Sequence, residues 1–283
     1  MACAEGLAAA ALILAGILLG GPASGLMAGA LPDTPAARVI GSGAVSEWNS
    51  VGCLEVNGLP FSGVVVERRF VLTAAHVVGA EPAHIRFLLP PGAHPGSYEA
   101  ASVNVFPGAS FPYNDLALVR LKRPVPEWVK IWPVYPSALP PHLPVIMVGV
   151  GGSGNGDRGV SVGAQSGVMR IGQNVIDAVV PAVDKSARIS RFYLYDFDGP
   201  QGSGPMGGPT LGNAVETMVA AGDSGSPVFG RIDGRIWLVG INNLGASVPG
   251  EKAMESRFGE IGGGMLLSYP PFLAWIHAVL SEQ

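Results

Sequence analysis

The chain has 283 residues, among them 41 glycines, 25 prolines and two cysteines, and its formal net charge is −4. This length fits one large all-β domain or two smaller ones, and it suffices to bury a core without disulfides. The weakly acidic balance, without any basic run, excludes an electrostatic footprint for nucleic acid. Abundant glycine and proline without a collagen repeat predict many short strands and turns.

The N-terminus carries an apolar run. Residues 7–19 read LAAAALILAGILL, and the small residues Ala28 and Ala30 stand where a signal peptidase would cut before Leu31. The pattern predicts a secretory signal peptide over 1–30, and therefore a secreted protein, extracellular or periplasmic, without stable membrane association. No Lys or Arg precedes the apolar run, so an uncleaved membrane anchor is the alternative.

Cysteine usage gives no disulfide. Cys3 would leave with the signal peptide, so Cys53 would stand alone in the mature chain. We expect it to be a buried, inert thiol.

Strands are expected along most of the remaining chain. After a short extended pro-segment over 31–38, residues 61–66 and 70–76 flank a tight polar turn, as in a hairpin. Prolines then accumulate between 124 and 144, which is the best candidate for a linker. One further strand-like segment, 115–121, precedes these prolines, and others follow them at 145–151, 167–172, 191–197, 226–230 and 235–242.

The C-terminal stretch has a different period. Phe272, Trp275, Ile276 and Val279 recur at helical spacing behind Pro270 and Pro271, which are suited to a helix start. We expect a C-terminal helix packed on the β-structure.

Three short segments carry the chemistry. The stretch AAGDSGSPVF places Ser224 in a glycine-rich loop before an apolar strand; such residues also suit an ordinary turn. His76 ends the segment TAAH, and Asp115 opens the apolar run of NDLALVRL, where a buried acid is costly unless it is paired. Asp115 could instead cap a turn with Asn114.

In this order, the segments TAAH, NDLALVRL and GDSGSP resemble the trypsin/chymotrypsin-like serine proteases, in a bacterial-type, disulfide-poor form. The resemblance runs from Val39 to the C-terminal helix. It implies an all-β fold of two antiparallel six-stranded β-barrels with a C-terminal helix. The first barrel would span 39–136 and hold His76 and Asp115; the second would span 137–283 and hold Ser224.

The resemblance also implies a serine endopeptidase that acts on proteins or peptides without a cofactor. Ser224 would be the nucleophile, His76 the general base and Asp115 its orienting acid. The N–H groups of Gly222 and Ser224 would form the oxyanion hole. No metal-ligand cluster is found in the sequence.

Activation by cleavage is a further implication. RVIGS at 38–42 resembles the family's activation site, where a cut after Arg38 would free the ammonium of Val39 to pair with Asp223. A separate activating protease is then expected, because Met218 stands at the position that floors the primary specificity pocket and offers no carboxylate.

The same resemblance implies which residues line the specificity pocket, and it shows where this chain departs from the family pattern. Asn243, Gly245 and Gly264 fall in the pocket walls, and the open apolar pocket predicts a large apolar residue before the scissile bond. Ser62 and Val77 replace family cysteines. Asn243 replaces a common serine, although its amide could still donate a hydrogen bond to Asp115.

Two other functions use the same residues. A catalytically silent binding module on this fold would usually lose the triad, which is complete here. An esterase with a GxSxG elbow would need glycine at 226, where Ser226 stands.

Overall fold

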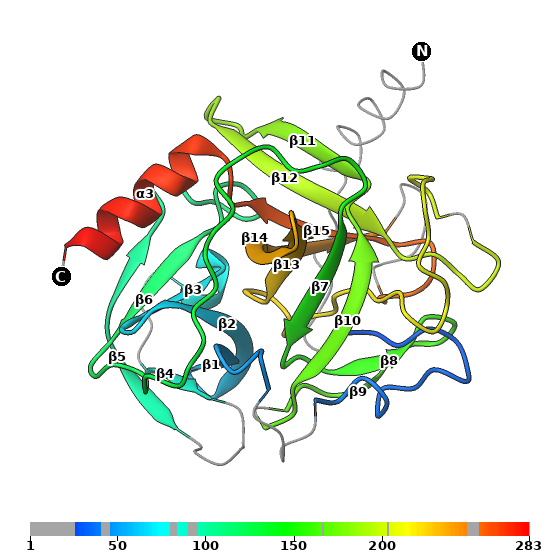
Figure 1. The fold of residues 1–283 in the computed structure, drawn as a ribbon, viewed down its shortest axis with the longest axis horizontal. Coiled ribbons are helices and arrows are strands. Elements are labelled where there is room, and N and C mark those ends of the chain that lie inside the picture. The colour runs from blue at the N-terminus through cyan, green and yellow to red at the C-terminus, as the bar shows by residue number, and fades with distance from the viewer. Residues whose placement is uncertain are drawn as a thin grey trace.

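The computed structural model describes residues 26–40, 46–79, 84–89, 96–165, 167–202, 204–247 and 255–282. Nearly all of its regular structure is antiparallel β-sheet, as the composition predicts (Figure 1). The expected signal peptide lies mostly outside these residues, as does Cys3. Within them, no helix is long and apolar enough to cross a membrane.

The first half is a closed six-stranded barrel in the order β1-β2-β3-β6-β5-β4. Its strands are β1 (Val51–Val56), β2 (Leu59–Glu67), β3 (Phe70–Thr73), β4 (Ile85–Leu88), β5 (Ser97–Val105) and β6 (Ala117–Leu121). Pairing of β1 with β4 closes it. The predicted hairpin is confirmed as β2 and β3, but β3 ends at Thr73, and His76 lies in the one-turn helix α2 (Ala75–Val78).

The second half is a seven-stranded sheet in the order β10-β7-β13-β14-β15-β12-β11. Its strands are β7 (Pro144–Gly149), β10 (Arg170–Val175), β11 (Ala178–Val183), β12 (Ile189–Asp196), β13 (Pro227–Ile232), β14 (Arg235–Ala246) and β15 (Ile261–Leu266). A small hairpin, β8 (Ser153–Asn155) with β9 (Gly159–Val162), stands apart from it.

A second closed barrel, as the family resemblance implied, is not observed. The edge strands β10 and β11 are joined by only Ile176 and Asp177. The N–H of Ile176 donates to the Leu143 carbonyl and that of Asp177 to the Leu194 carbonyl. The two linking residues thus bond to different neighbours, one to the residue before β7 and the other to β12. No hydrogen-bonded ladder forms between β10 and β11.

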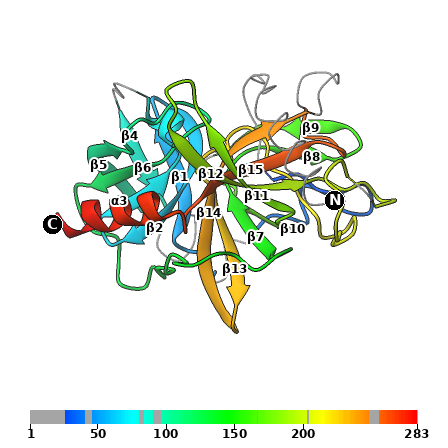
Figure 2. The same cartoon turned by 90° about the horizontal axis from the view of Figure 1, so that it is seen from above.

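Each end of the described chain packs on the opposite half. The helix α3 (Pro270–Ser281), predicted from its period, lies along the barrel beside β5 and β6 (Figures 1 and 2). There Phe272 and Trp275 contact Phe106, with ring centroids 4.9 and 5.4 Å apart. Residues 26–40, which we call the N-terminal strap, lie against the second half near β8, β9 and β10 (Figure 1).

The hydrophobic core follows this division. One cluster fills the barrel around Leu54, Val71 and Val119. A second lies within the sheet half and includes Leu26 and Met27 of the strap. A third joins the two halves and α3, and contains the following buried residues among others: Trp48, Cys53, Leu118, Phe229, Ile241, Phe272. Cys53 is a buried free thiol as expected, and burial raises its pKa to about 12.

Candidate active site

His76, Asp115 and Ser224 meet where the barrel faces the sheet. His76 Nδ1 lies 2.6 Å from Asp115 Oδ2, and His76 Nε2 lies 2.9 Å from Ser224 Oγ. The His76 side chain is 27% exposed, whereas that of Asp115 is 1% exposed. A proton can therefore pass between the hydroxyl and the accessible imidazole, while the carboxylate holds the ring from the buried side.

Asp115 is held by donors from both halves. The backbone N–H of His76 donates to its Oδ1 over 2.7 Å, and Asn243 Nδ2 donates to its Oδ2 over 3.0 Å. These bonds compensate the burial of a carboxylate. Asn243, which lies in β14 and replaces a common serine, thus donates the hydrogen bond to Asp115 that its amide was expected to allow.

Asn114, offered as a turn partner of Asp115, anchors this corner to the second half. Its φ is +51°, an angle that Asn adopts more readily than most residues. Its N–H donates to Ser190 Oγ over 2.9 Å, and the Ser190 hydroxyl donates back to Asn114 Oδ1 over 2.9 Å. Ser190 had no signal in the sequence, because it lies 76 positions away in β12.

The loop that carries Ser224 is pinned by the barrel. Ser62 in β2 donates its N–H to the Ser224 carbonyl over 3.0 Å and its hydroxyl to the Gly222 carbonyl over 3.2 Å. Gly225 has a φ of +86°, and a Cβ there would stand 2.1 Å from Thr73 Oγ1 and 2.2 Å from the Ser62 carbonyl. Only glycine allows this close approach of the two halves. Sequence reasoning noted Ser62 only as a lost cysteine and missed this role.

The N–H groups of Gly222 and Ser224 remain available to a ligand. Neither donates a hydrogen bond to any part of the chain that the structure describes. Gly222 has a φ of +93°. Two free amides beside a nucleophilic hydroxyl are suited to bind an oxyanion.

A family model of the trypsin-like peptidase domain matches residues 61–241, which include His76, Asp115 and Ser224. The chain belongs to this family. A search of the curated proteins found no match.

Within this trypsin-like peptidase, the residues expected to act in activation lie apart. The N–H of Val39 donates to the Ala36 carbonyl over 3.3 Å and does not contact Asp223. Asp223 is fully buried and accepts from the N–H groups of Gly151 and Ala220 over 3.3 and 3.2 Å. Burial raises the pKa of Asp223, and the nearby positive charge of Arg170 opposes that rise.

Of the residues expected to form the specificity pocket, Met218, Asn243 and Gly264 are buried and Gly245 is half-buried. Met218 has no exposed surface and belongs to the core cluster that contains Leu26 and Met27. A Cβ added at Gly264 would stand 2.6 Å from the Tyr193 hydroxyl and 1.9 Å from the Ile241 carbonyl. The Tyr193 hydroxyl and the Ile241 carbonyl therefore occupy the space directly beside Gly264. Gly245 pairs with Gly262 in the ladder of β14 and β15.

Glu216 lies two residues before Met218, yet its carboxylate is engaged elsewhere. It accepts from the Asp198 N–H, the Thr210 hydroxyl and the Leu211 N–H over 3.1 to 3.2 Å. Burial raises its pKa to about 7. Across the described residues, no group of three or more His, Cys, Asp or Glu side chains is arranged to hold a metal ion.

Proposed function

We propose that this trypsin-like peptidase is a serine endopeptidase that hydrolyses peptide bonds through an acyl-enzyme. The observation that carries the proposal is the continuous chain from Asp115 Oδ2 to His76 and on to Ser224 Oγ, with contacts of 2.6 and 2.9 Å. These are hydrogen-bond distances for a nucleophile, its base and an orienting acid.

Acylation follows from this geometry. Ser224 Oγ attacks the carbonyl carbon of the substrate while its proton moves to His76 Nε2. The carbonyl oxygen becomes an oxyanion that accepts from the N–H groups of Gly222 and Ser224. Asp115 stabilises the imidazolium. The C–N bond then breaks as His76 returns the proton to the leaving amine.

Deacylation repeats these steps with water. Water gives a proton to His76 and attacks the acyl carbon, and the bond to Ser224 breaks as His76 returns the proton to Oγ. The products are a carboxylic acid and an amine, and no cofactor is consumed.

For the residue before the scissile bond, we propose a small apolar side chain. Met218 offers no charge to a Lys, Arg, Asp or Glu side chain. The Tyr193 hydroxyl beside Gly264, bonded to Asn242 Oδ1 at 2.8 Å, favours a smaller residue than the large one expected from the sequence. A peptide series with Ala, Val, Phe, Lys or Glu at this position tests it. The highest kcat/KM with Lys, Glu or Phe would contradict the proposal.

We further propose that the protein is secreted and that its domain boundary lies near residue 137, between β6 and β7. Secretion rests on the apolar run at 7–19, outside the described residues. Immunodetection of the chain in the culture medium or periplasm, against the cytoplasm, measures it.

A fluorophosphonate probe tests the catalytic proposal directly. We expect wild type to be labelled on Ser224, and Ser224→Ala to lose both labelling and peptidase activity. The control is Ser186→Ala, at an exposed serine of the turn between β11 and β12, which should keep both. Labelling of Ser224→Ala would refute the assigned nucleophile. A folded wild type without labelling or activity would instead favour the silent binding module.

A further inference from the structure

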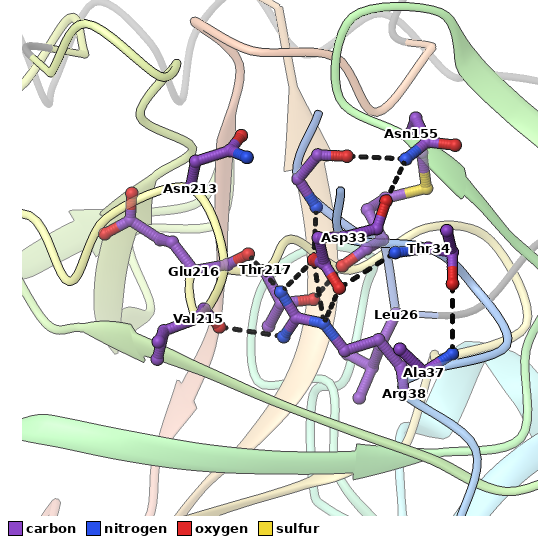
Figure 3. Close-up of polar contacts among 12 residues, drawn as sticks. Leu26, Asp33, Thr34, Ala37, Arg38, Asn155, Asn213, Val215, Glu216 and Thr217 are labelled. Atoms are coloured by element: carbon purple, nitrogen blue, oxygen red, sulfur yellow. Dashed lines mark hydrogen bonds and ion pairs between the residues drawn. The ribbon is translucent and has the colours of Figure 1, made fainter. Parts of the chain in front are cut away.

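The N-terminal strap is built into the second half. Leu26, Met27 and Ala28 have no exposed surface. The N–H of Met27 donates to the Met218 carbonyl, and the Met27 carbonyl accepts from the Thr217 hydroxyl. Asn155 Nδ2 donates to the Gly29 and Asp33 carbonyls (Figure 3). A dispensable leader would not be expected to fill core space in this way.

Arg38 is the anchor of the strap. Its side chain is 8% exposed, and its Nε donates to the Asp33 carboxylate over 3.0 and 3.2 Å. The same guanidinium donates to the Val215 carbonyl over 2.8 Å and to the Glu216 carbonyl over 3.0 Å. Figure 3 shows Arg38 reaching from the strap between Asp33 and these two carbonyls. A planar guanidinium suits such divided donation.

The residues whose carbonyls accept hydrogen bonds from Arg38 lead directly into the loop that carries Ser224. Val215, Glu216 and Thr217 stand before Met218, and the loop follows from Ala220 to Ser224. The strap also bonds to β10 and to the residue before it. The N–H of Ile171 donates to the Arg38 carbonyl over 2.9 Å, and that of Ile40 donates to the Met169 carbonyl over 2.8 Å. The backbone on both sides of the bond between Arg38 and Val39 is therefore paired.

We infer that Arg38 is a positioning residue and not a cleavage site. The mature enzyme retains residues 26–38, and with them the whole N-terminal strap, which fixes the pocket-floor segment 215–218. The inference rests on the proposed peptidase function. A trypsin-like protease must bind the side chain of Arg38, which is buried and ion-paired. Removal of the strap would leave Met218 uncovered, so the signal peptidase must cut upstream of Leu26, where Ala23 and Gly25 offer small residues.

The mature N-terminus is the first test. Full-length wild type and Ser224→Ala are expressed, and the purified proteins are sequenced from the N-terminus and weighed intact. We expect both to contain 26–38 and neither to begin at Val39, before or after added trypsin. A mature chain that begins at Leu31 or Val39 would overturn the inference. Because the readout is mass, it decides the question even if the peptidase proposal fails.

Blocking the cut is the second test. Val39→Pro makes the preceding bond resistant to trypsin-like proteases and removes one N–H donor, the bond to Ala36. We expect labelling and kcat/KM to stay within about twofold of wild type, which is under 0.5 kcal/mol. A folded Val39→Pro protein that is inactive, beside an active wild type, would show that the cut is required.

Positioning is tested with Arg38→Gln and Arg38→Lys, with Arg158→Gln at an exposed arginine as the control. We expect Arg38→Gln to lower kcat/KM on peptides about tenfold or more, mainly through KM, with probe labelling changed less than about twofold. Lys should restore part of the loss. Equal falls in labelling and kcat/KM would mean only a smaller folded fraction and would contradict positioning. If Arg38→Gln does not fold, Asp33→Asn takes its place.

Discussion

The barrel and the sheet half are completed in different ways. Six strands close the barrel on themselves through β1 and β4, whereas the seven strands of the second half leave β10 and β11 as edges. Both halves receive a segment from the far end of the chain: α3 covers the barrel, and the strap covers the sheet half. The difference is that α3 contributes mainly apolar rings, while the strap adds buried hydrogen bonds and an ion pair to the apolar side chains of Leu26 and Met27.

The candidate active site combines the two kinds of support. His76 and Asp115 sit beside closed barrel strands, and Ser224 sits on a loop that precedes β13. Yet the loop is pinned by Ser62 of the barrel, and Asp115 is pinned by Asn243 of the sheet. Each half thus orients a proposed catalytic group of the other. A substitution in either half should therefore alter peptide hydrolysis, and the following substitutions separate the contributions of the two halves.

The largest effect should come from removing one triad member from either half. His76→Ala and Ser224→Ala should each lower kcat/KM by on the order of 10⁴-fold or more, because the members act as a unit. The double variant should be no worse than the single ones, as measured by peptide hydrolysis. His84→Ala, at a half-exposed barrel histidine, is the control. Multiplying losses in the double variant would mean that the two residues act separately.

Loss of the packing of α3 on the barrel should have the next largest effect. Phe272→Ala removes a fully buried ring that contacts Phe106, and we expect the free energy of unfolding to fall by about 3–5 kcal/mol. Denaturant unfolding measures it. His277→Ala on the exposed side of the same helix should change it by less than about 0.5 kcal/mol. Equal effects at the two positions would show that α3 does not brace the barrel.

Loss of the hydrogen bond from Asn243 of the sheet half to Asp115 of the barrel half should have a smaller effect. Asn243→Leu removes the donor to Asp115 Oδ2, and hydrogen bonds to charged groups contribute about 1.5–3 kcal/mol. We expect kcat/KM to fall by about 10–100-fold, converted at about 1.4 kcal/mol per decade. Asn243→Ser should recover part of the loss. Full activity in Asn243→Leu would show that barrel contacts alone hold Asp115.

The smallest effect concerns the pH dependence of the sheet half. Burial raises the pKa of Glu216 from 4.5 to about 7, so the folded state binds this proton more tightly than the unfolded state does. Stability should therefore fall as pH rises from about 4.5 to about 7 and then level off for this group.

Glu216→Gln should reduce that slope by about 1 kcal/mol per pH unit, as followed by denaturant unfolding across the range. Some slope should persist up to about pH 8 from Asp177, whose pKa burial raises to about 8. The control Glu47→Gln, at an exposed carboxyl, should leave the slope unchanged. Stability that rises through this window, or an unchanged slope in Glu216→Gln, would contradict the assignment.

The sequence by itself determined the family and the elements whose signals are local. Two apolar runs on either side of a tight polar turn predicted the hairpin of β2 and β3, and helical spacing predicted α3. The segments TAAH, NDLALVRL and GDSGSP predicted the residues that the fold brings together. These succeed because the period of burial and the residue types of a tight loop are written over a few neighbouring positions.

Tertiary structure alone decided what depends on distant contacts. Nothing local shows that Ser62 holds the Ser224 loop, that Ser190 anchors Asn114, or that β10 and β11 remain unpaired. RVIGS read locally predicts a cut after Arg38, but Asp33 and the carbonyls of Val215 and Glu216 surround that side chain. A basic residue on the surface is accessible to a protease, whereas a basic residue buried against a carboxylate is suited to anchor a segment, the role that we infer for Arg38. Only burial distinguishes the two cases, and burial depends on the whole fold.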